Sequence, residues 1–164
     1  MKKIIIATLG ALAIAGVAFW QFGGASSAAP NVSFTTLSGE KITTEDLRGK
    51  VVLVKFWATS CVTCIAQMPD AIDNYNDLSP KGFDTIAVAM DYDPPNYVRN
   101  FAQSRQLPFK VVMDSTGEIA KAFGDVKLTP TAFLIDKNGN IIKRYLGNYD
   151  KDAFLNTVNK ALAS

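Results

Sequence analysis

Apolar residues along this chain form short continuous runs that alternate with stretches of mixed apolar and polar residues from Pro30 onward. A nearly continuous apolar run is typical of a strand that is covered on both faces of a sheet. Buried strands are predicted at residues 51–57, 83–91 and 109–113, and shorter extended pieces at 31–37 and 40–43. Helices are predicted at residues 61–78, 96–105, 115–123 and 150–163. Pro69 predicts a kink in the first of these helices, because proline has no N–H to donate.

Two further apolar runs near the carboxyl end, residues 131–136 and 141–146, flank Asn138-Gly139. Asn-Gly between apolar runs is a strong signal for a β-hairpin. Strands that alternate with helices, without repeats, predict a single α/β domain over residues 30–164. We expect a central mixed sheet with helices on its faces.

Residues 1–29 have a different pattern, which predicts a membrane-targeting segment. Lys2 and Lys3 precede an apolar run from Ile4 to Phe22, and small residues follow as far as Ala29. This is the order of a signal peptide, cleaved after Ser26-Ser27-Ala28 or Ser27-Ala28-Ala29. An uncleaved anchor is the alternative, because the run of about 19 residues is long enough to span a bilayer. Either reading, with the lysines on the cytoplasmic side, predicts an extracytoplasmic domain.

The composition excludes several kinds of site. Histidine is absent, which rules out catalytic Ser/His and Cys/His pairs and the metal sites that depend on imidazole. Lys and Arg number 17 and Asp and Glu 15, and without Lys2 and Lys3 the count is 15 against 15. A neutral body argues against nucleic acid as a partner. No cofactor and no resident metal are expected.

The whole thiol inventory is Cys61 and Cys64, a Cys-x-x-Cys pair at the start of the helix that follows a buried strand. Unpaired N–H groups at a helix start favour a thiolate, so Cys61 is the expected nucleophile. Cys64, one turn later, is placed to resolve a mixed disulfide. The alternative is a static disulfide or a pair of buried thiols.

Two separated motifs carry a resemblance to a known family. Lys55-Phe56-Trp57-Ala58-Thr59-Ser60-Cys61-Val62-Thr63-Cys64, followed by Met68-Pro69, resembles the active-site stretch of the TlpA/ResA-like membrane-associated thioredoxins. Leu128-Thr129-Pro130-Thr131-Ala132-Phe133-Leu134-Ile135-Asp136 resembles the proline strand of the same family. The likeness covers roughly residues 31–163 and implies a thioredoxin-like fold, with an extra helix and strand inserted around residues 95–113.

The resemblance also implies a function and a geometry. Pro130 is expected to be cis and to face Cys61, with the Thr129 backbone exposed for substrate pairing; a trans proline that starts an edge strand is the alternative. The implied activity is reduction of extracytoplasmic protein disulfides, with electrons from a membrane donor and with cytochrome c maturation as a plausible pathway.

Several positions depart from the family pattern. Ser60 stands where relatives commonly have tryptophan, Val62-Thr63 replaces a dipeptide that ends in proline, and Gln67 replaces a glutamate that can titrate. Lys55 stands where thioredoxins often have a buried acid, so its amine is the nearest group that could exchange protons. The favoured interpretation of Lys55 is nevertheless a side chain that runs past apolar neighbours to solvent.

The remaining candidates have simpler interpretations. Phe56 is predicted to lie in the core and Trp57 to support the cysteine turn. Asp91, Asp93 and Asp114 lie beside prolines and turns, so ordinary loop chemistry accounts for them.

Two other functions stay open. A peroxiredoxin-like thiol peroxidase would use the same kind of cysteine, but Val54 and Ala58 occupy the positions of the proline and threonine in its Pro-x-x-x-Thr-x-x-Cys motif. A Cu(I) carrier could use two soft thiolates, although no histidine is available as a third ligand.

Overall fold

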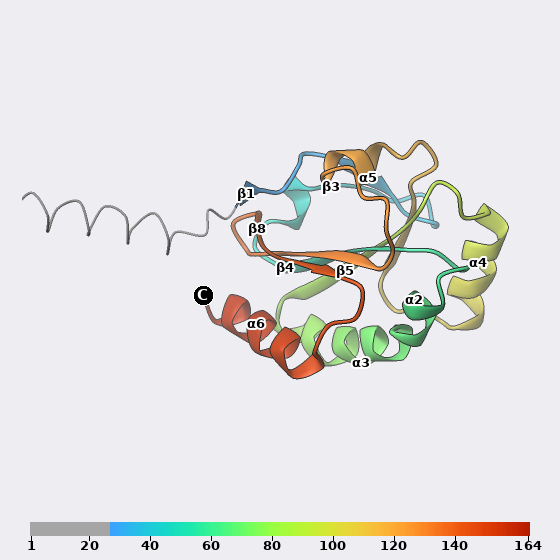
Figure 1. The fold of residues 1–164 in the computed structure, drawn as a ribbon. Coiled ribbons are helices and arrows are strands. Elements are labelled where there is room, and N and C mark those ends of the chain that lie inside the picture. Colours follow the sequence, from blue (N-terminus) through green and yellow to red (C-terminus); the bar gives the residue numbers. More distant parts are fainter. Residues whose placement is uncertain (1–26) are drawn as a thin grey trace, which may run out of the picture.

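A six-stranded sheet runs through the centre of residues 27–164, the part of the chain that the computed structural model describes (Figure 1). In spatial order its strands are β1 (Ser27–Ala28), β8 (Asn140–Leu146), β7 (Thr131–Ile135), β4 (Val51–Trp57), β5 (Phe83–Ala89) and β6 (Lys110–Met113). Strands β4, β5 and β6 are parallel to one another, whereas β7 is antiparallel to both β4 and β8. The predicted mixed sheet is confirmed.

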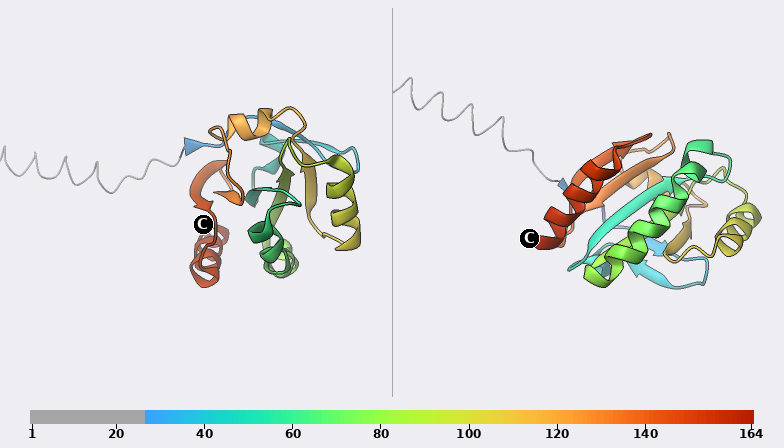
Figure 2. Two further views of the ribbon diagram at one scale, coloured as in Figure 1. Left: turned by 45° about the vertical axis from the view of Figure 1, so that its right-hand side comes forward. Right: turned by 90° about the horizontal axis from the view of Figure 1, so that it is seen from below.

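Helices cover both faces of this sheet. One face carries α2 (Val62–Ala66), α3 (Met68–Leu78), α4 (Pro95–Ser104) and α6 (Lys151–Ala163). The other carries α5 (Glu118–Ala122), the hairpin of β2 (Ser33–Thr35) and β3 (Lys41–Thr43), and the 3-10 turn η1 (Glu45–Leu47). A second 3-10 turn, η2 (Ser79–Lys81), follows α3. Figure 2 shows α3 and α6 lying across the sheet when it is seen from below.

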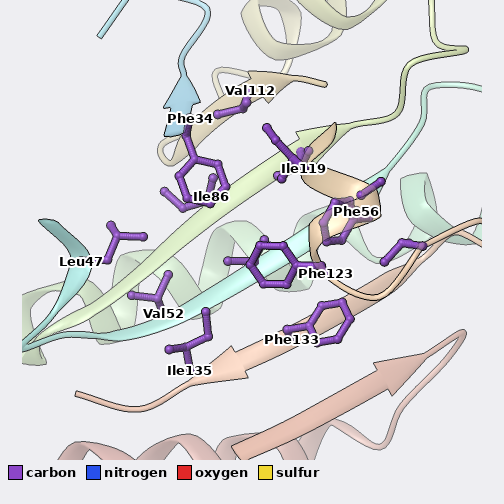
Figure 3. Close-up of a cluster of buried hydrophobic side chains, with 14 of the residues drawn as sticks. Phe34, Leu47, Val52, Phe56, Ile86, Val112, Ile119, Phe123, Phe133 and Ile135 are labelled. Atoms are coloured by element: carbon purple, nitrogen blue, oxygen red, sulfur yellow. The ribbon is translucent and has the colours of Figure 1, made fainter. Parts of the chain in front are cut away.

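The central strand β4 explains why two separate cores form. Its side chains alternate, so Val52, Val54 and Phe56 belong to the core under α5. Figure 3 shows Val52 and Phe56 in this core. Val51 and Leu53 pack under α6 on the opposite face. Because both faces are covered, every residue of β4 is buried, which is why its sequence shows no alternation of apolar and polar residues. Lys55 is the one charged residue in this strand.

Several predicted elements are confirmed, and two need correction. Strand β4 has the predicted bounds, and the β7–β8 hairpin, α4 and β6 are present. The helix predicted at 61–78 is interrupted beside Pro69, as expected, but the interruption divides it into two helices that meet at Gln67, because Pro69 in the first turn of α3 has no N–H to continue the ladder. Helix α5 begins at Glu118, not at Ser115, since Gly117 has a left-handed backbone (φ +71°).

The amino-terminal part of the described chain adds a strand at positions that the sequence pattern assigns to the targeting segment. Ser27 and Ala28 pair with Ile141 and Asn140 at the edge of the sheet. Residues 1–26 lie outside the described part, so the signal peptide and the anchor both stay predictions. Within residues 27–164 no helix combines the length and the apolar character needed to cross a membrane.

Candidate active site

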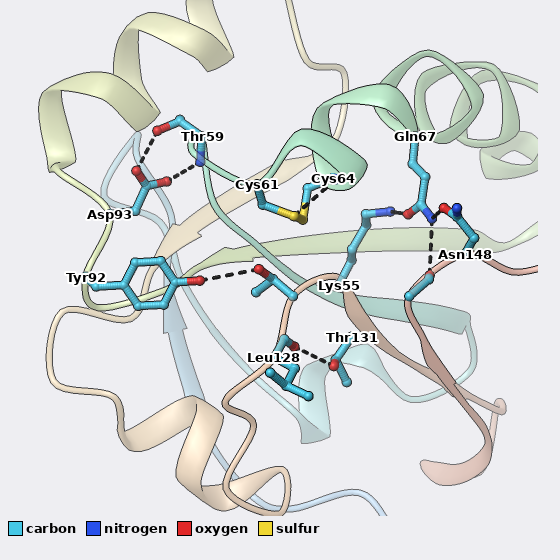
Figure 4. Close-up of a disulfide and its surroundings, with 12 residues drawn as sticks. Lys55, Thr59, Cys61, Cys64, Gln67, Tyr92, Asp93, Leu128, Thr131 and Asn148 are labelled. Atoms are coloured by element: carbon cyan, nitrogen blue, oxygen red, sulfur yellow. Dashed lines mark hydrogen bonds between the residues drawn. A yellow bond between two sulfur atoms is a disulfide. The ribbon is translucent and has the colours of Figure 1, made fainter.

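A disulfide between Cys61 and Cys64 lies where β4 passes into α2 (Figure 4). The sulfurs are 2.16 Å apart and the Cα atoms 5.2 Å apart. Cys61 is the N-cap of α2, and its Sγ accepts a hydrogen bond of 3.2 Å from the Cys64 N–H. Because α2 has only five residues, this N–H group stabilises charge on Cys61 more directly than a helix dipole would.

The two cysteines differ in their exposure to solvent. Cys61 is half-buried, whereas Cys64 is completely buried among side chains from β4, β5 and α3. An incoming thiol or disulfide can therefore reach Cys61, while Cys64 is shielded behind it. This asymmetry suits a nucleophile in front and a resolving thiol behind.

The turn before Cys61 is held by Asp93, a residue for which the sequence suggests only ordinary loop chemistry. Its carboxylate is buried and accepts two hydrogen bonds from Thr59, one from the backbone N–H (2.6 Å) and one from the hydroxyl (2.5 Å). A carboxylate with two short donors is a strong anchor. The sequence offers no signal for this contact, which joins positions 34 apart.

A second loop adjoins the site at the start of β7. The Thr129-Pro130 peptide bond is cis, as the resemblance implies. Thr131 pairs with Phe56, so the antiparallel register brings Pro130 level with the end of β4. The Thr129 hydroxyl lies 3.3 Å from the Tyr92 hydroxyl, and in the described part of the chain the Thr129 backbone makes no hydrogen bond.

Trp57 lies beneath the cysteine pair. Its side chain is completely buried in the same cluster as Cys64, and its ring packs against Phe101 of α4 at 5.3 Å between centroids. The indole N–H has no hydrogen-bond partner among the described residues. Trp57 therefore contacts the site from below and is not itself open to a substrate.

Lys55 contradicts the interpretation that it runs to solvent. Its side chain is 1% exposed, and its Nζ donates a 2.6 Å hydrogen bond to Oε1 of Gln67. Gln67 in turn donates to the Gly147 carbonyl (3.2 Å) and to Oδ1 of Asn148 (3.0 Å), both in the loop between β8 and α6. Burial lowers the pKa of the Lys55 amine to about 8, and the Asp70 carboxylate opposes that shift.

A metal site needs several ligand side chains close together. Between residues 27 and 164 no three Cys, Asp or Glu side chains are grouped as a metal site. The two cysteine sulfurs are joined to each other.

Comparison with protein families matches residues 24–162 to the Redoxin family. The thiol-disulfide oxidoreductase ResA of Bacillus thuringiensis subsp. konkukian is 40% identical over 124 residues, which cover 76% of this chain and 70% of the relative. The Bacillus subtilis ResA is 33% identical over 121 residues, covering 74% of this chain and 66% of the relative.

Solved structures agree with this relationship. A thiol:disulfide interchange protein of the thioredoxin family from Chlorobium tepidum superposes with a TM-score of 0.76 at 29% identity, covering 84% of this chain and 97% of that one. The pneumococcal exposed lipoprotein thioredoxin from Streptococcus pneumoniae gives a TM-score of 0.69 at 25% identity, covering 79% and 98% of the two chains. The fold is therefore thioredoxin-like, as expected.

Proposed function

This chain belongs to the Redoxin family and is a thiol-disulfide oxidoreductase, and we propose that it acts as a reductant of protein disulfides outside the cytoplasm. The observation that carries the proposal is the asymmetry of the cysteine pair: Cys61 is accessible and receives a backbone N–H, while Cys64 is buried directly behind it. A static structural disulfide has no need of an accessible sulfur.

The proposed reaction has two steps. The Cys61 thiolate attacks one sulfur of a client disulfide, forms a mixed disulfide and releases the other client sulfur as a thiolate. The Cys64 thiolate then attacks Cys61, and the second client sulfur leaves. The client gains two electrons, and the enzyme is left with the Cys61–Cys64 disulfide, which a membrane electron donor must reduce.

We also propose where the client lies. The unpaired Thr129 backbone beside the cis proline is free to pair with an extended client segment. Two exposed apolar side chains, Val62 (83% exposed) and Leu128 (65% exposed), flank the cysteine pair and the proline loop. An apolar client segment on either side of its cysteine would cover both.

Location and pathway rest on the sequence and on relatives. The Lys2-Lys3 and apolar pattern of residues 1–29 supports export, and one relative is described as an exposed lipoprotein. The resemblance of the two sequence motifs to the TlpA/ResA-like thioredoxins makes cytochrome c maturation a candidate pathway.

A trapping experiment tests this proposal. Replacing Cys64 with serine removes the resolving thiol, so the Cys64→Ser protein is expected to accumulate a mixed disulfide through Cys61 when it is expressed in its host. The Cys61→Ser/Cys64→Ser protein is the matched control and should capture nothing. If Cys64→Ser traps no partner while the parent protein reduces disulfides, the roles assigned to the two cysteines are wrong.

The direction of electron transfer needs a separate measurement. A reduction potential of the Cys61–Cys64 pair near roughly −270 mV would support a reductant, whereas one near roughly −120 mV would indicate an oxidant. Peroxide consumption with a thiol donor, measured on the same preparation, distinguishes a peroxidase.

A further inference from the structure

The buried amine of Lys55 has no charged partner to explain its presence. Within residues 27–164 no carboxylate forms an ion pair with it, and its one hydrogen-bond partner is the neutral amide of Gln67. Its Nζ also lies 5.9 Å from the centroid of the Tyr149 ring. A buried ammonium without an anion is costly, so an anion that forms nearby during function would stabilise it.

Cys64 is the group that can supply this anion. Gln67 follows Cys64 by three residues, so their side chains lie on neighbouring turns of the same side of the helical segment. Figure 4 shows the Lys55 side chain rising from β4 between the disulfide and Gln67. Lys55 and Cys64 are both shielded from water, which strengthens any interaction between their charges.

Of the other titratable groups near Lys55, one is an exposed carboxylate and two are tyrosines. Asp70 of α3 is exposed and is paired with Lys151 of α6 at 2.5 Å. Tyr149 and Tyr145 belong to the loop before α6 and to β8, and burial raises the pKa of Tyr149 to about 12, so it stays neutral near pH 7. In the reduced enzyme, Cys64 is thus the anionic candidate that shares the buried environment of Lys55.

A cavity of about 250 Å³ lies beside this environment, between α3 and the start of α6. Its lining includes Gln67 and Tyr149, the two residues in contact with the Lys55 amine, together with Asp70, Asn148 and Lys151. Asn148 is exposed, and it accepts a hydrogen bond from Gln67. Cys61 does not line this cavity, so the cavity offers protons a route to water that is separate from the client side.

We propose that Lys55 compensates the charge of the Cys64 thiolate and exchanges its proton during resolution of the mixed disulfide. The neutral form of the Lys55 amine takes up the Cys64 S–H proton, and the ammonium that results compensates the charge of the thiolate as it attacks Cys61. The Cys61–Cys64 bond forms as the bond between Cys61 and the client breaks, and the client sulfur leaves as a thiolate. The extra proton on Lys55 then passes to water in the cavity. This inference rests on the resolving role proposed for Cys64.

The test isolates resolution from any natural client. Reduced protein is treated with Ellman's reagent so that Cys61 carries thionitrobenzoate, and release of the second thionitrobenzoate reports the attack by Cys64 at each pH. In Lys55→Met the midpoint of this pH profile is expected to rise by at least about one unit, which makes release about tenfold slower at neutral pH. The thiol pKa of Cys64, titrated in Cys61→Ser with and without Lys55→Met, should rise by the same amount.

Lys151→Met is the matched control, because it removes a cation that lines the same cavity but is exposed and paired with Asp70. It should leave the profile unchanged. Equal profiles for the parent and Lys55→Met would overturn the inference, and so would equal shifts in Lys55→Met and Lys151→Met. If Lys55→Met fails to fold, Lys55→Gln gives the same readout. Because no client is involved, failure to trap a client would leave this result standing, so the two proposals can fail separately.

Discussion

The buried amine of Lys55 makes a quantitative prediction about stability in the oxidised protein. The pKa of this amine is about 8 in the folded chain, against an ordinary lysine value of 10.5 that applies once the chain unfolds. Between these values the unfolded chain binds a proton that the folded chain has released, so raising the pH favours the folded state. Relative to a chain without the lysine, the free energy of unfolding should rise by about 1.3 kcal/mol between about pH 7 and pH 9.

This pH window is unusually free of other titrations. The chain has no histidine, and both cysteines are oxidised. Tyrosine begins to ionise only near about pH 10 in the unfolded chain, so its opposing effect lies higher. Burying the charged amine costs about 3 kcal/mol below pH 8, since the shift is 10.5 − 8 = 2.5 pKa units. Lys55→Met removes this cost but leaves the Gln67 oxygen unpaired, so the pH slope is a sharper test than the stability at one pH.

The assay is urea unfolding of the oxidised protein at several pH values, followed by far-ultraviolet circular dichroism. The parent should show the rise, and Lys55→Met should be flat. Lys110→Met is the control, because Lys110 is paired with Asp84 at 2.8 Å and has a raised pKa, so the slope should match that of the parent. A parent protein whose stability is flat from pH 7 to 9, or a Lys55→Met protein with the parent slope, would refute the reasoning.

Three further substitutions test the supporting structure. Asp93→Asn weakens both hydrogen bonds to the turn before the cysteines, so the free energy of unfolding in urea should fall by about 1.5–3 kcal/mol and disulfide exchange should slow. Asp114→Asn is the control: it alters the capping of α5 and should affect stability alone. Tyr92→Phe removes the hydroxyl contact with Thr129, so KM for a protein disulfide should rise while stability stays within about 0.5 kcal/mol; an unchanged KM counts against that contact. Phe56→Ala should cost about 3–5 kcal/mol, and a loss below about 1 kcal/mol would mean that the core under α5 does not depend on this ring.

The parts of the fold that sequence predicts well are those with local causes. Residues 51–57 form a strand with the predicted bounds because a continuous apolar run has few alternatives there. The hairpin around Asn138-Gly139 is predicted because the turn needs a left-handed residue, and Gly139 has φ +82°. The redox pair is predicted because Cys61 and Cys64 are three positions apart at the start of a helix that follows a buried strand.

The parts that sequence does not predict depend on contacts between distant positions. From sequence alone Lys55 is predicted to reach solvent, because a lysine in a strand usually extends its amine to water. The side-chain amide of Gln67 that accepts its hydrogen bond lies in a different element, so the strand pattern gives no sign of it. Gln67 meets Asn148 across 81 positions, and no local pattern records that contact. Asp93 lies beside prolines in the sequence, which indicates only a turn, whereas in the structure its carboxylate accepts a hydrogen bond from Thr59. Local propensity carries no information about such pairs.

The Cys61 side and the Lys55 side of the cysteine pair therefore have different roles. On the client side, Cys61 is accessible, Val62 and Leu128 are exposed and apolar, and the Thr129 backbone is unpaired, which suits an apolar extended segment. A client bound there excludes water from the reacting sulfurs, so a proton that leaves Cys64 cannot depart by the same route. Lys55 contacts Gln67, which lines a cavity whose lining includes none of these client-side residues. Separate routes for client and proton let Cys64 attack Cys61 while the mixed disulfide is still shielded from water. A glutamate at position 67 could accept the Cys64 proton, but Gln67 cannot titrate, so in this chain the Lys55 amine takes that role.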